Sequence, residues 1–198
     1  MVLDESVRLD YRIICSIVEP ESKLLDLGCG EGKLLHFLYR EKKTKGQGIE
    51  LSEEAIYKCV ENGVSVFHGD IEQGLTDYPD NTFDYIILNQ SMQEIKKVDY
   101  VIEEALRVAK KVIVGFPNFA HYKARLRLVI KGQSPVTTAL PYRWYDTPNV
   151  HFLSILDFKE FCEVKGIKIL DTYYLGKKRE IGFMPNLFAV NAIFVISR

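Results

Sequence analysis

The sequence predicts an α/β fold: a Rossmann-like, seven-stranded, mostly parallel sheet with helices on both faces and a C-terminal antiparallel β-hairpin. Short apolar runs of strand type alternate with helical periodicity along most of the chain, which is typical of right-handed βαβ crossovers. The last two apolar runs, 167–175 and 187–197, leave no room for a helix between them, so we expect them to pair antiparallel. The 198 residues, 47% hydrophobic and 27% charged, fit one globular domain spanning 1–198.

The elements follow in order along the chain. Val7, Tyr11, Ile14 and Val18 share one helical face, and Pro20 ends that first helix. The further predicted elements are a strand at about 23–27, a helix around 34–38, a strand over 46–51, a helix over 53–61 capped by Ser52, strands within 64–70 and 83–89, a helix over 98–109 and a strand over 111–116.

A glycine-rich turn, "LDLGCGEG", follows the first predicted strand and opens the next helix. Gly28 permits a tight turn and Gly30 a close approach of the backbone to a ligand, while Glu50 stands 20 positions beyond Gly30 at the end of the next strand. A nicotinamide dinucleotide fingerprint would need its third glycine at position 33, which is Lys33. The turn therefore indicates a nucleoside cofactor other than NAD.

Acidic residues at the ends of three strands narrow the choice of cofactor. Asp26, just before the turn, would repel a pyrophosphate but attract the ammonium and sulfonium of S-adenosylmethionine (SAM). Glu50 suits a ribose diol, because one carboxylate accepts from both hydroxyls, and Asp70 suits an adenine amine. Alternatively, such acids only face solvent. Their order along the chain favours SAM or its demethylated product, S-adenosylhomocysteine.

These residues resemble the class I SAM-dependent methyltransferases, and the segments "FPNFAHYKARLRL", "PVTTALPYRWYDTPNVH" and "LSILDFKEFC" resemble the methionine biosynthesis protein W (MetW) family. The resemblance covers essentially the whole chain. It implies the seven-stranded methyltransferase fold and a cofactor site made by residues at the strand ends, with Asn89 and Gln90 at the methionyl end. The implied cofactor-binding residues are Asp26, Gly28, Cys29, Gly30, Glu50, Leu51, Asp70, Ile71, Asn89 and Gln90.

The resemblance also implies a role in methionine biosynthesis alongside a homoserine O-acyltransferase. A stand-alone methyltransferase acting on an unidentified small molecule is the alternative. Methyl transfer from a sulfonium depends mainly on positioning, so the sequence assigns no catalytic residue. The nucleophile or base candidates, each of which also suits a helix cap, a packing group or a loop hydrogen bond, are His121, Tyr122, Tyr145, Asp146 and His151.

Composition argues against several other functions. The formal net charge of -1 and a pI near 6.4 are unlike the basic charge of proteins that bind nucleic acid. Four cysteines, at positions 15, 29, 59 and 162, form no CxxC pair and have no histidine at ligand spacing, so we expect free thiols and no metal. The acidic N-terminal segment is unlike a signal peptide, and no apolar run reaches the ~18 residues of a membrane span. We expect a soluble, cytoplasmic protein that binds no membrane.

The segment at about 117–152 is an insertion that the sheet does not need. Phe119, Tyr122, Leu126, Val129 and Ile130 can share one helical face, and basic residues at 123, 125, 127 and 131 point to the other sides. A solvated helix over a core and a docking helix for a protein partner both fit this pattern. The following loop, stiffened by prolines and rich in aromatic residues, fits a lid over the cofactor mouth or a satellite core.

Overall fold

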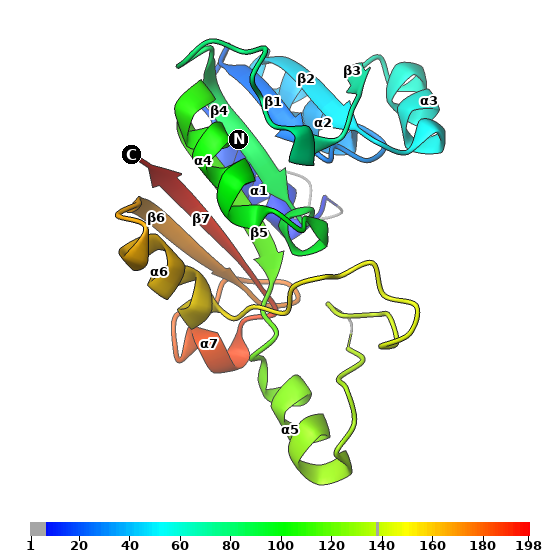
Figure 1. The fold of residues 1–198 in the computed structure, drawn as a ribbon, viewed down its shortest axis with the longest axis vertical. Coiled ribbons are helices and arrows are strands. Elements are labelled where there is room, and N and C mark those ends of the chain that lie inside the picture. Colours follow the sequence, from blue (N-terminus) through cyan, green and yellow to red (C-terminus); the bar gives the residue numbers. More distant parts are fainter. Residues whose placement is uncertain (1–6, 138) are drawn as a thin grey trace.

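A seven-stranded sheet forms the centre of the protein in the computed structural model, which describes residues 7–137 and 139–198 (Figure 1). The strand order is β3-β2-β1-β4-β5-β7-β6. The first five strands of this order run parallel, and β7 is antiparallel to both β5 and β6. The predicted fold class, with its C-terminal antiparallel hairpin, is confirmed.

The elements alternate along the chain as expected. The strands are β1 (Lys23–Leu27), β2 (Lys45–Glu50), β3 (Ser65–His68), β4 (Phe83–Asn89), β5 (Ala109–Pro117), β6 (Lys168–Leu175) and β7 (Asn191–Ser197). The α-helices are α1 (Leu9–Ile17), α2 (Lys33–Lys42), α3 (Glu53–Glu61), α4 (Val98–Val108), α5 (Tyr122–Lys131), α6 (Ile155–Val164) and α7 (Pro185–Phe188). Two short 3-10 helices, η1 (Ile71–Gln73) and η2 (Met92–Glu94), follow β3 and β4.

Each face of the sheet is buried under its own helices. Side chains of α4 and α6 pack on one face, where the Phe158 and Phe194 rings lie 4.8 Å apart. Side chains of α1 and α2 pack on the other face, together with buried Cys59 of α3. Because both faces are covered, the central strands are apolar on both sides, which is usual for parallel sheets.

The strand order places a switch point at the carboxyl end of β1. This strand lies between β2 and β4, and Asp26 is in register with Gly48 on one side and Ile87 on the other. Strands β2 and β3 follow on one side of β1, and β4 and β5 follow on the other, so the strand order reverses at β1. Open α/β sheets bind ligands at such switch points, outside the carboxyl ends of the strands.

Two local expectations are wrong. A short helix, α7, lies between β6 and β7, where we expected no room for one and assigned its last residues to the final strand. Pro185 stands in its first turn, where a missing N–H costs no hydrogen bond. The Asn118 amide donates to the carbonyls of Asn186 (3.1 Å) and Ala189 (2.9 Å), which stabilises the turn. Ala109, expected to be helical, begins β5, since α4 passes into that strand without a loop.

The expectation of a helix starting at Phe119 also needs correction. The helix begins at Tyr122, because His121 is its N-cap and its ring accepts a hydrogen bond from the Lys123 N–H at 3.3 Å. In Figure 1 this helix projects away from the sheet. Within the described residues, no helix is long and apolar enough to cross a membrane.

Candidate functional site

The glycine turn after β1 depends on glycine at position 28. Gly28 has φ of +76°, and its N–H donates to the Ile49 carbonyl of β2 at 2.9 Å. A Cβ at this position would lie 2.8 Å from the Ser91 Cβ, closer than such atoms approach in proteins. Ser91 is fixed in turn, because its hydroxyl donates to the Leu27 carbonyl at 2.8 Å. The turn is thus packed between β2 and the segment after β4.

Glu50 connects the glycine turn to the end of β2. One carboxylate oxygen accepts from the Gly30 N–H at 2.8 Å, and the other accepts from the N–H groups of Leu51 and Ser52, each at 2.9 Å. Three backbone donors therefore converge on one carboxylate, which orients it. Above Gly30 there is open space, since an added Cβ would meet no atom within 4 Å. A ligand can approach the backbone there.

Asp26 is the least solvated carboxylate of the site. It lies near the carboxyl end of β1, and the residue is only 3% exposed. Burial, and secondarily the charge of Glu50, raises the pKa of Asp26 to about 7. Among the residues that the structure describes, no hydrogen bond to this carboxylate contributes to the shift. A buried acid without a donor is expected to be stabilised by a cation from outside the protein.

The end of β4 lies beside the carboxyl end of β1, on the side away from β2. Gln90 adopts φ of +66°, a left-handed conformation that is uncommon outside glycine. Its N–H donates to the Gly115 carbonyl at 2.7 Å, and its carbonyl accepts from the Gln93 amide at 2.7 Å. The Asn89 amide donates to Asp10 of α1 at 3.0 Å. Its carbonyl oxygen is buried against Gly115 of β5 and has no partner among the described residues.

Asp10 and Arg8 are site residues that the sequence analysis missed. Asp10 is 5% exposed, and Arg8 holds its carboxylate through two hydrogen bonds of 2.6 and 3.1 Å. The signal was present in the helical spacing, because Asp10 precedes the buried Ile13 and Ile14 by three and four positions. An acid on the buried face of a helix predicts a polar partner. Here the partners are Arg8 and, at the end of β4, Asn89.

The residues predicted beside the adenine ring lie in different environments. Asp70 caps η1, because its carboxylate accepts from the Glu72 N–H at 2.8 Å. Ile71 is partly buried against the core on the α4 side of the sheet. Leu51 is 62% exposed, so it is free to cover a planar ring. The chain brings Asp70 close to Glu50 through a hydrogen bond from the Gly69 N–H to the Glu50 carbonyl, at 3.1 Å.

Cys29 packs beneath the turn. Its sulfur lies 3.8 Å from that of Cys59, whose thiol donates to the Gly30 carbonyl at 3.0 Å. Burial raises the pKa of the Cys29 thiol, so this group stays protonated and is a poor nucleophile. A Cβ at Gly48 of β2 would fall inside the Cys29 side chain, which explains glycine at that position. All four predicted thiols, including Cys15 and Cys162, are free and buried.

The nucleophile and base candidates make structural hydrogen bonds or packing contacts within the chain. Burial, followed by the charges of Lys123 and Lys177, lowers the pKa of His121, which caps α5. Arg143 donates to the Tyr145 hydroxyl at 2.9 Å through its side chain and to Asp146 at 2.7 Å through its backbone. Tyr122 and His151 have ring and backbone contacts: Tyr122 packs on Phe188 at 6.0 Å, and the His151 N–H donates to the Gln93 carbonyl at 3.0 Å.

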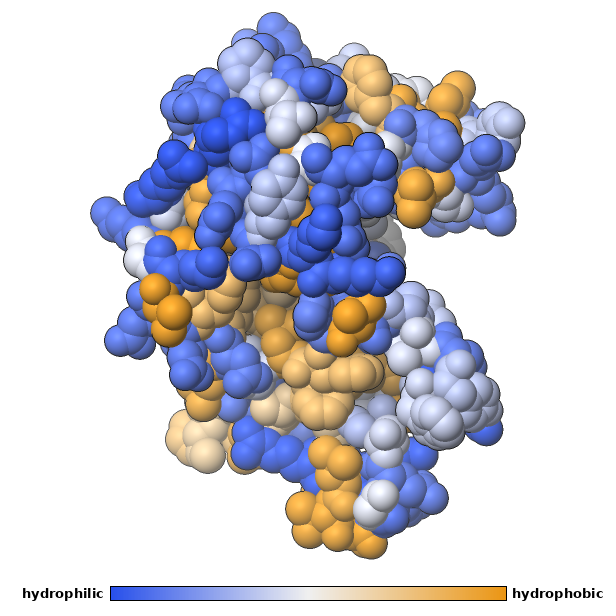
Figure 2. Space-filling model, viewed as in Figure 1, coloured by the Kyte–Doolittle hydropathy of each residue, from blue (hydrophilic) through white to orange (hydrophobic). Residues whose placement is uncertain are grey.

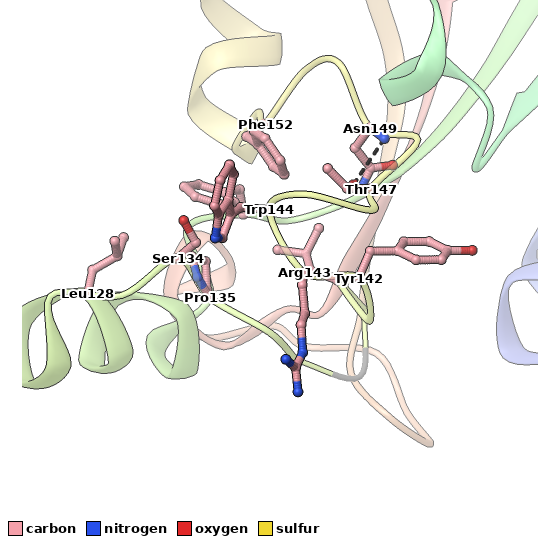
Figure 3. A pocket seen from close by; sticks show the side chains of 11 residues that line it. Leu128, Ser134, Pro135, Tyr142, Arg143, Trp144, Thr147, Asn149 and Phe152 are labelled. Atoms are coloured by element: carbon pink, nitrogen blue, oxygen red, sulfur yellow. Dashed lines mark hydrogen bonds between the residues drawn. The ribbon is translucent and has the colours of Figure 1, made fainter.

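The segment 117–152 contacts η2, the 3-10 helix after β4. The N–H groups of Val150 and His151 both donate to the Gln93 carbonyl, at 2.8 and 3.0 Å, and Gln93 in turn holds Gln90. Beside this contact, between α5 and the loop, is a cavity of about 280 Å³ (Figure 3). The residues that line it include Phe119, Leu140, Trp144, Thr147, Asn149 and Phe152. The arrangement provides a small, largely apolar pocket within the segment 117–152.

Comparison with known proteins agrees with this geometry. The family model of methionine biosynthesis protein MetW matches residues 8–196. The bifunctional methionine biosynthesis protein MetXA/MetW of Rhodopirellula baltica is 31% identical over 208 residues, which cover 98% of this chain and 33% of that protein. This chain therefore spans about a third of the length of that curated relative.

Solved structures share the fold at low identity. A SAM-dependent methyltransferase from Mesorhizobium loti superimposes with a TM-score of 0.71 at 13% identity, covering 98% of this chain and all of that one (100%). The [4+2]-cyclase SpnF superimposes with a TM-score of 0.67 at 20% identity, covering 99% of this chain and 85% of that one. One fold thus carries proteins named for different chemistries.

Proposed function

Because this chain belongs to the family of methionine biosynthesis protein MetW, we propose that it binds SAM, or S-adenosylhomocysteine, and acts in the cytoplasm with a homoserine O-acyltransferase. The observation that carries the cofactor proposal is the buried Asp26 carboxylate beside the switch point, whose pKa is raised to about 7. A ligand with an ammonium and a sulfonium supplies the positive charge that this site lacks.

In this proposal the remaining predicted residues bind the rest of the cofactor. Glu50 already accepts from the Gly30 N–H, and it accepts from the two ribose hydroxyls on its ligand side. Leu51 and Ile71 flank the adenine, and Asp70 accepts from its amine. Asn89, at the end of β4, and Gln90 after it lie against the methionyl end of the cofactor.

The partner proposal is supported by the composition of the Rhodopirellula baltica relative. Its name joins MetXA to MetW, and this chain matches only 33% of its length. Joining two components in one chain keeps each at a high effective concentration near the other. We therefore propose that this chain, which matches the MetW family, associates with the corresponding acyltransferase. SAM lies downstream of methionine, so its binding would report end-product level to that complex.

A second candidate function is methyl transfer to a small molecule. It is favoured by the cavity of about 280 Å³ that Asn149 and Phe152 line, because the adjoining residue Val150 hydrogen-bonds to Gln93 of η2, the 3-10 helix after β4. An acceptor held there would need orientation toward the methyl group and little else. Transfer of a labelled methyl group from SAM to a candidate acceptor would favour this function over a purely binding role.

Calorimetric titration and thermal shift test the cofactor proposal. SAM at 100 times its dissociation constant should raise the melting temperature by roughly 5 to 10 °C, and NAD should not. Asp26→Asn should weaken SAM binding by about tenfold or more, since a close charge pair is worth up to ~4 kcal/mol before desolvation. The matched control is Asp77→Asn on the surface, which should bind SAM normally. Equal affinity for SAM in the Asp26 and Asp77 variants would contradict the proposed site.

A further inference from the structure

Helix α5 carries an apolar ridge that this chain leaves uncovered. Val129 is 84% exposed, Ile130 74% and Leu126 50%. Of the side chains in this helix, only that of Ala124 is buried, so the helix does not lie over a core as one of our interpretations supposed. Figure 2 shows hydrophobic side chains at the protruding end of the molecule, where Figure 1 places α5. An apolar patch of this kind usually marks an interaction site.

A groove with two arginines adjoins the ridge. It lies between the end of α5 and the following loop, has a volume of about 870 Å³, and is lined by Arg127, Arg143, Trp144 and Tyr145 among others. The Nε of Arg127 is buried and has no acceptor among the residues that the structure describes. A buried guanidinium N–H without an acceptor is costly. Because Arg127 and Arg143 both line this groove, it offers guanidinium donors to an acceptor that another molecule brings.

The charged side chains of helix α5 all have one sign. Helix α5 contains four basic residues and no acidic one. Arg125 is satisfied within the chain, because its side chain donates to the Ala120 carbonyl at 2.6 Å. Arg143 lies with its guanidinium 6.0 Å from the Tyr145 ring. The cations that face the groove are thus Arg127 and Arg143, and carboxylates are the acceptors that guanidinium groups bind in two-pronged geometry.

We propose that the ridge and the groove together form the docking surface for the acyltransferase partner. This inference rests on the proposed function. The matching surface on the partner carries a carboxylate that enters the groove between Arg127 and Arg143, and apolar side chains that cover Val129 and Ile130. Arginine, tryptophan and tyrosine are the residue types that most often dominate binding energy in protein interfaces.

The same features disfavour other occupants of this surface. A second copy of the chain in a two-fold interface would bring its own basic helix against this one, and like charges repel. An anionic bilayer would attract the cations, but a flat lipid surface does not supply an acceptor deep in a groove. Each of these occupants predicts its own pattern of binding among variants of the surface.

Two double variants test the surface. Arg127→Glu with Arg143→Glu reverses the groove, and Val129→Ser with Ile130→Ser removes the ridge. Arg40→Glu with Lys168→Glu changes the net charge as the groove variant does, on exposed residues of α2 and β6 outside the inserted segment. The full-length acyltransferase of the same organism is the binding partner, and its affinity for each variant is measured at low and at high salt. The same samples are titrated with SAM.

The groove variant should bind the acyltransferase roughly 30-fold more weakly or worse, since losing one partner of a desolvated charge pair costs about 2 kcal/mol or more. The ridge variant should lose affinity with little change in salt dependence. The control should stay within about twofold of wild type. Melting temperature and SAM affinity should be unchanged in all of them, which excludes misfolding.

The outcomes separate the two proposals. If the wild type binds the acyltransferase and both surface variants bind equally well, the docking surface is wrong and the proposed partnership stands. If the wild type does not bind it at either salt concentration, the partnership fails, and the docking inference fails with it. Dimerisation of the wild type alone that the ridge variant abolishes, or binding to phosphatidylserine vesicles that the groove variant abolishes, would assign the surface to another occupant and overturn the inference.

Discussion

The glycine turn after β1 and helix α5 differ in how far the chain satisfies its own groups. At the turn, the N–H groups of Gly30, Leu51 and Ser52 all bond to Glu50. Gly28 packs against Ser91, the second residue after β4. In α5, by contrast, Val129 and Ile130 are exposed to solvent. A region held by internal contacts is preorganised for a ligand, whereas a region with uncovered apolar surface is suited to a partner.

The largest expected effect that tests this comparison comes from two glycines with the same handedness. Gly28 (φ +76°) and Gly132 (φ +59°) both adopt left-handed conformations, but an added Cβ clashes at Gly28 and meets nothing within 4 Å at Gly132, the C-cap of α5. Gly28→Ala should therefore cost roughly 3 kcal/mol or more, from backbone strain and overpacking. Gly132→Ala should cost only about 1 to 2 kcal/mol.

Urea denaturation of both variants measures these free energies of unfolding. Losses that agree within ~0.5 kcal/mol would mean that the turn is no more constrained than the end of the exposed helix. The comparison between the two regions would then be unfounded.

A smaller effect is expected from pH, because the pKa of Asp26 in the free protein is about 7. A cationic ligand binds the ionised carboxylate, so SAM affinity should rise with pH up to about 7 and level off above it. Below the pKa the affinity should change by up to about tenfold per pH unit. Titration calorimetry over this range measures the slope. Asp26→Asn should flatten it, which separates Asp26 from ionisation of SAM itself; an unchanged slope in the variant would exclude Asp26 as the titrating group.

The stability of the unliganded protein should change with pH in the opposite direction. The pKa of Asp26 is raised from the ordinary 3.8 to about 7, so the folded state binds the proton more tightly than the unfolded state does. The resulting stability is fully present below about pH 4 and is lost as the pH rises through about 7. Asp26→Asn should remove this contribution to the slope, as thermal unfolding at a series of pH values will show. A steeper fall of stability with pH in the variant would mean that Asp26 stabilises the ionised form instead.

The smallest expected effect lies on the ridge. Val129→Ser with Ile130→Ser should change the free energy of unfolding by no more than ~0.5 kcal/mol per site, because neither side chain is buried. Ile102→Ser, at a position of α4 that is 1% exposed, should cost several kcal/mol and serves as the contrast. Chemical denaturation compares them. A large loss in the ridge variant would show that the ridge packs within the isolated chain.

Local features of the site were predictable from the sequence because they depend on short stretches of backbone. Glycine at position 28 indicated a tight turn, and the backbone there is left-handed. The positions of Asp26 and Glu50 at strand ends followed from apolar runs that stop at a polar residue. Since parallel strands end at one edge of a sheet, these acids had to lie near one another. The antiparallel pairing of the last two strands was predicted correctly, although the connection between them contains α7.

Contacts between distant parts of the chain were decided only by the tertiary structure. Asn89 meets Asp10 across 79 positions, and no local pattern specifies that pair. The connection before β7 contains α7 because Asn118, on another strand end, bonds to its carbonyls. The spacing of α5 correctly indicated an apolar face, but a periodic pattern says which side chains share a face and not what covers it. Burial is a property of the assembled surfaces, so only the folded chain could show that Val129 and Ile130 remain exposed.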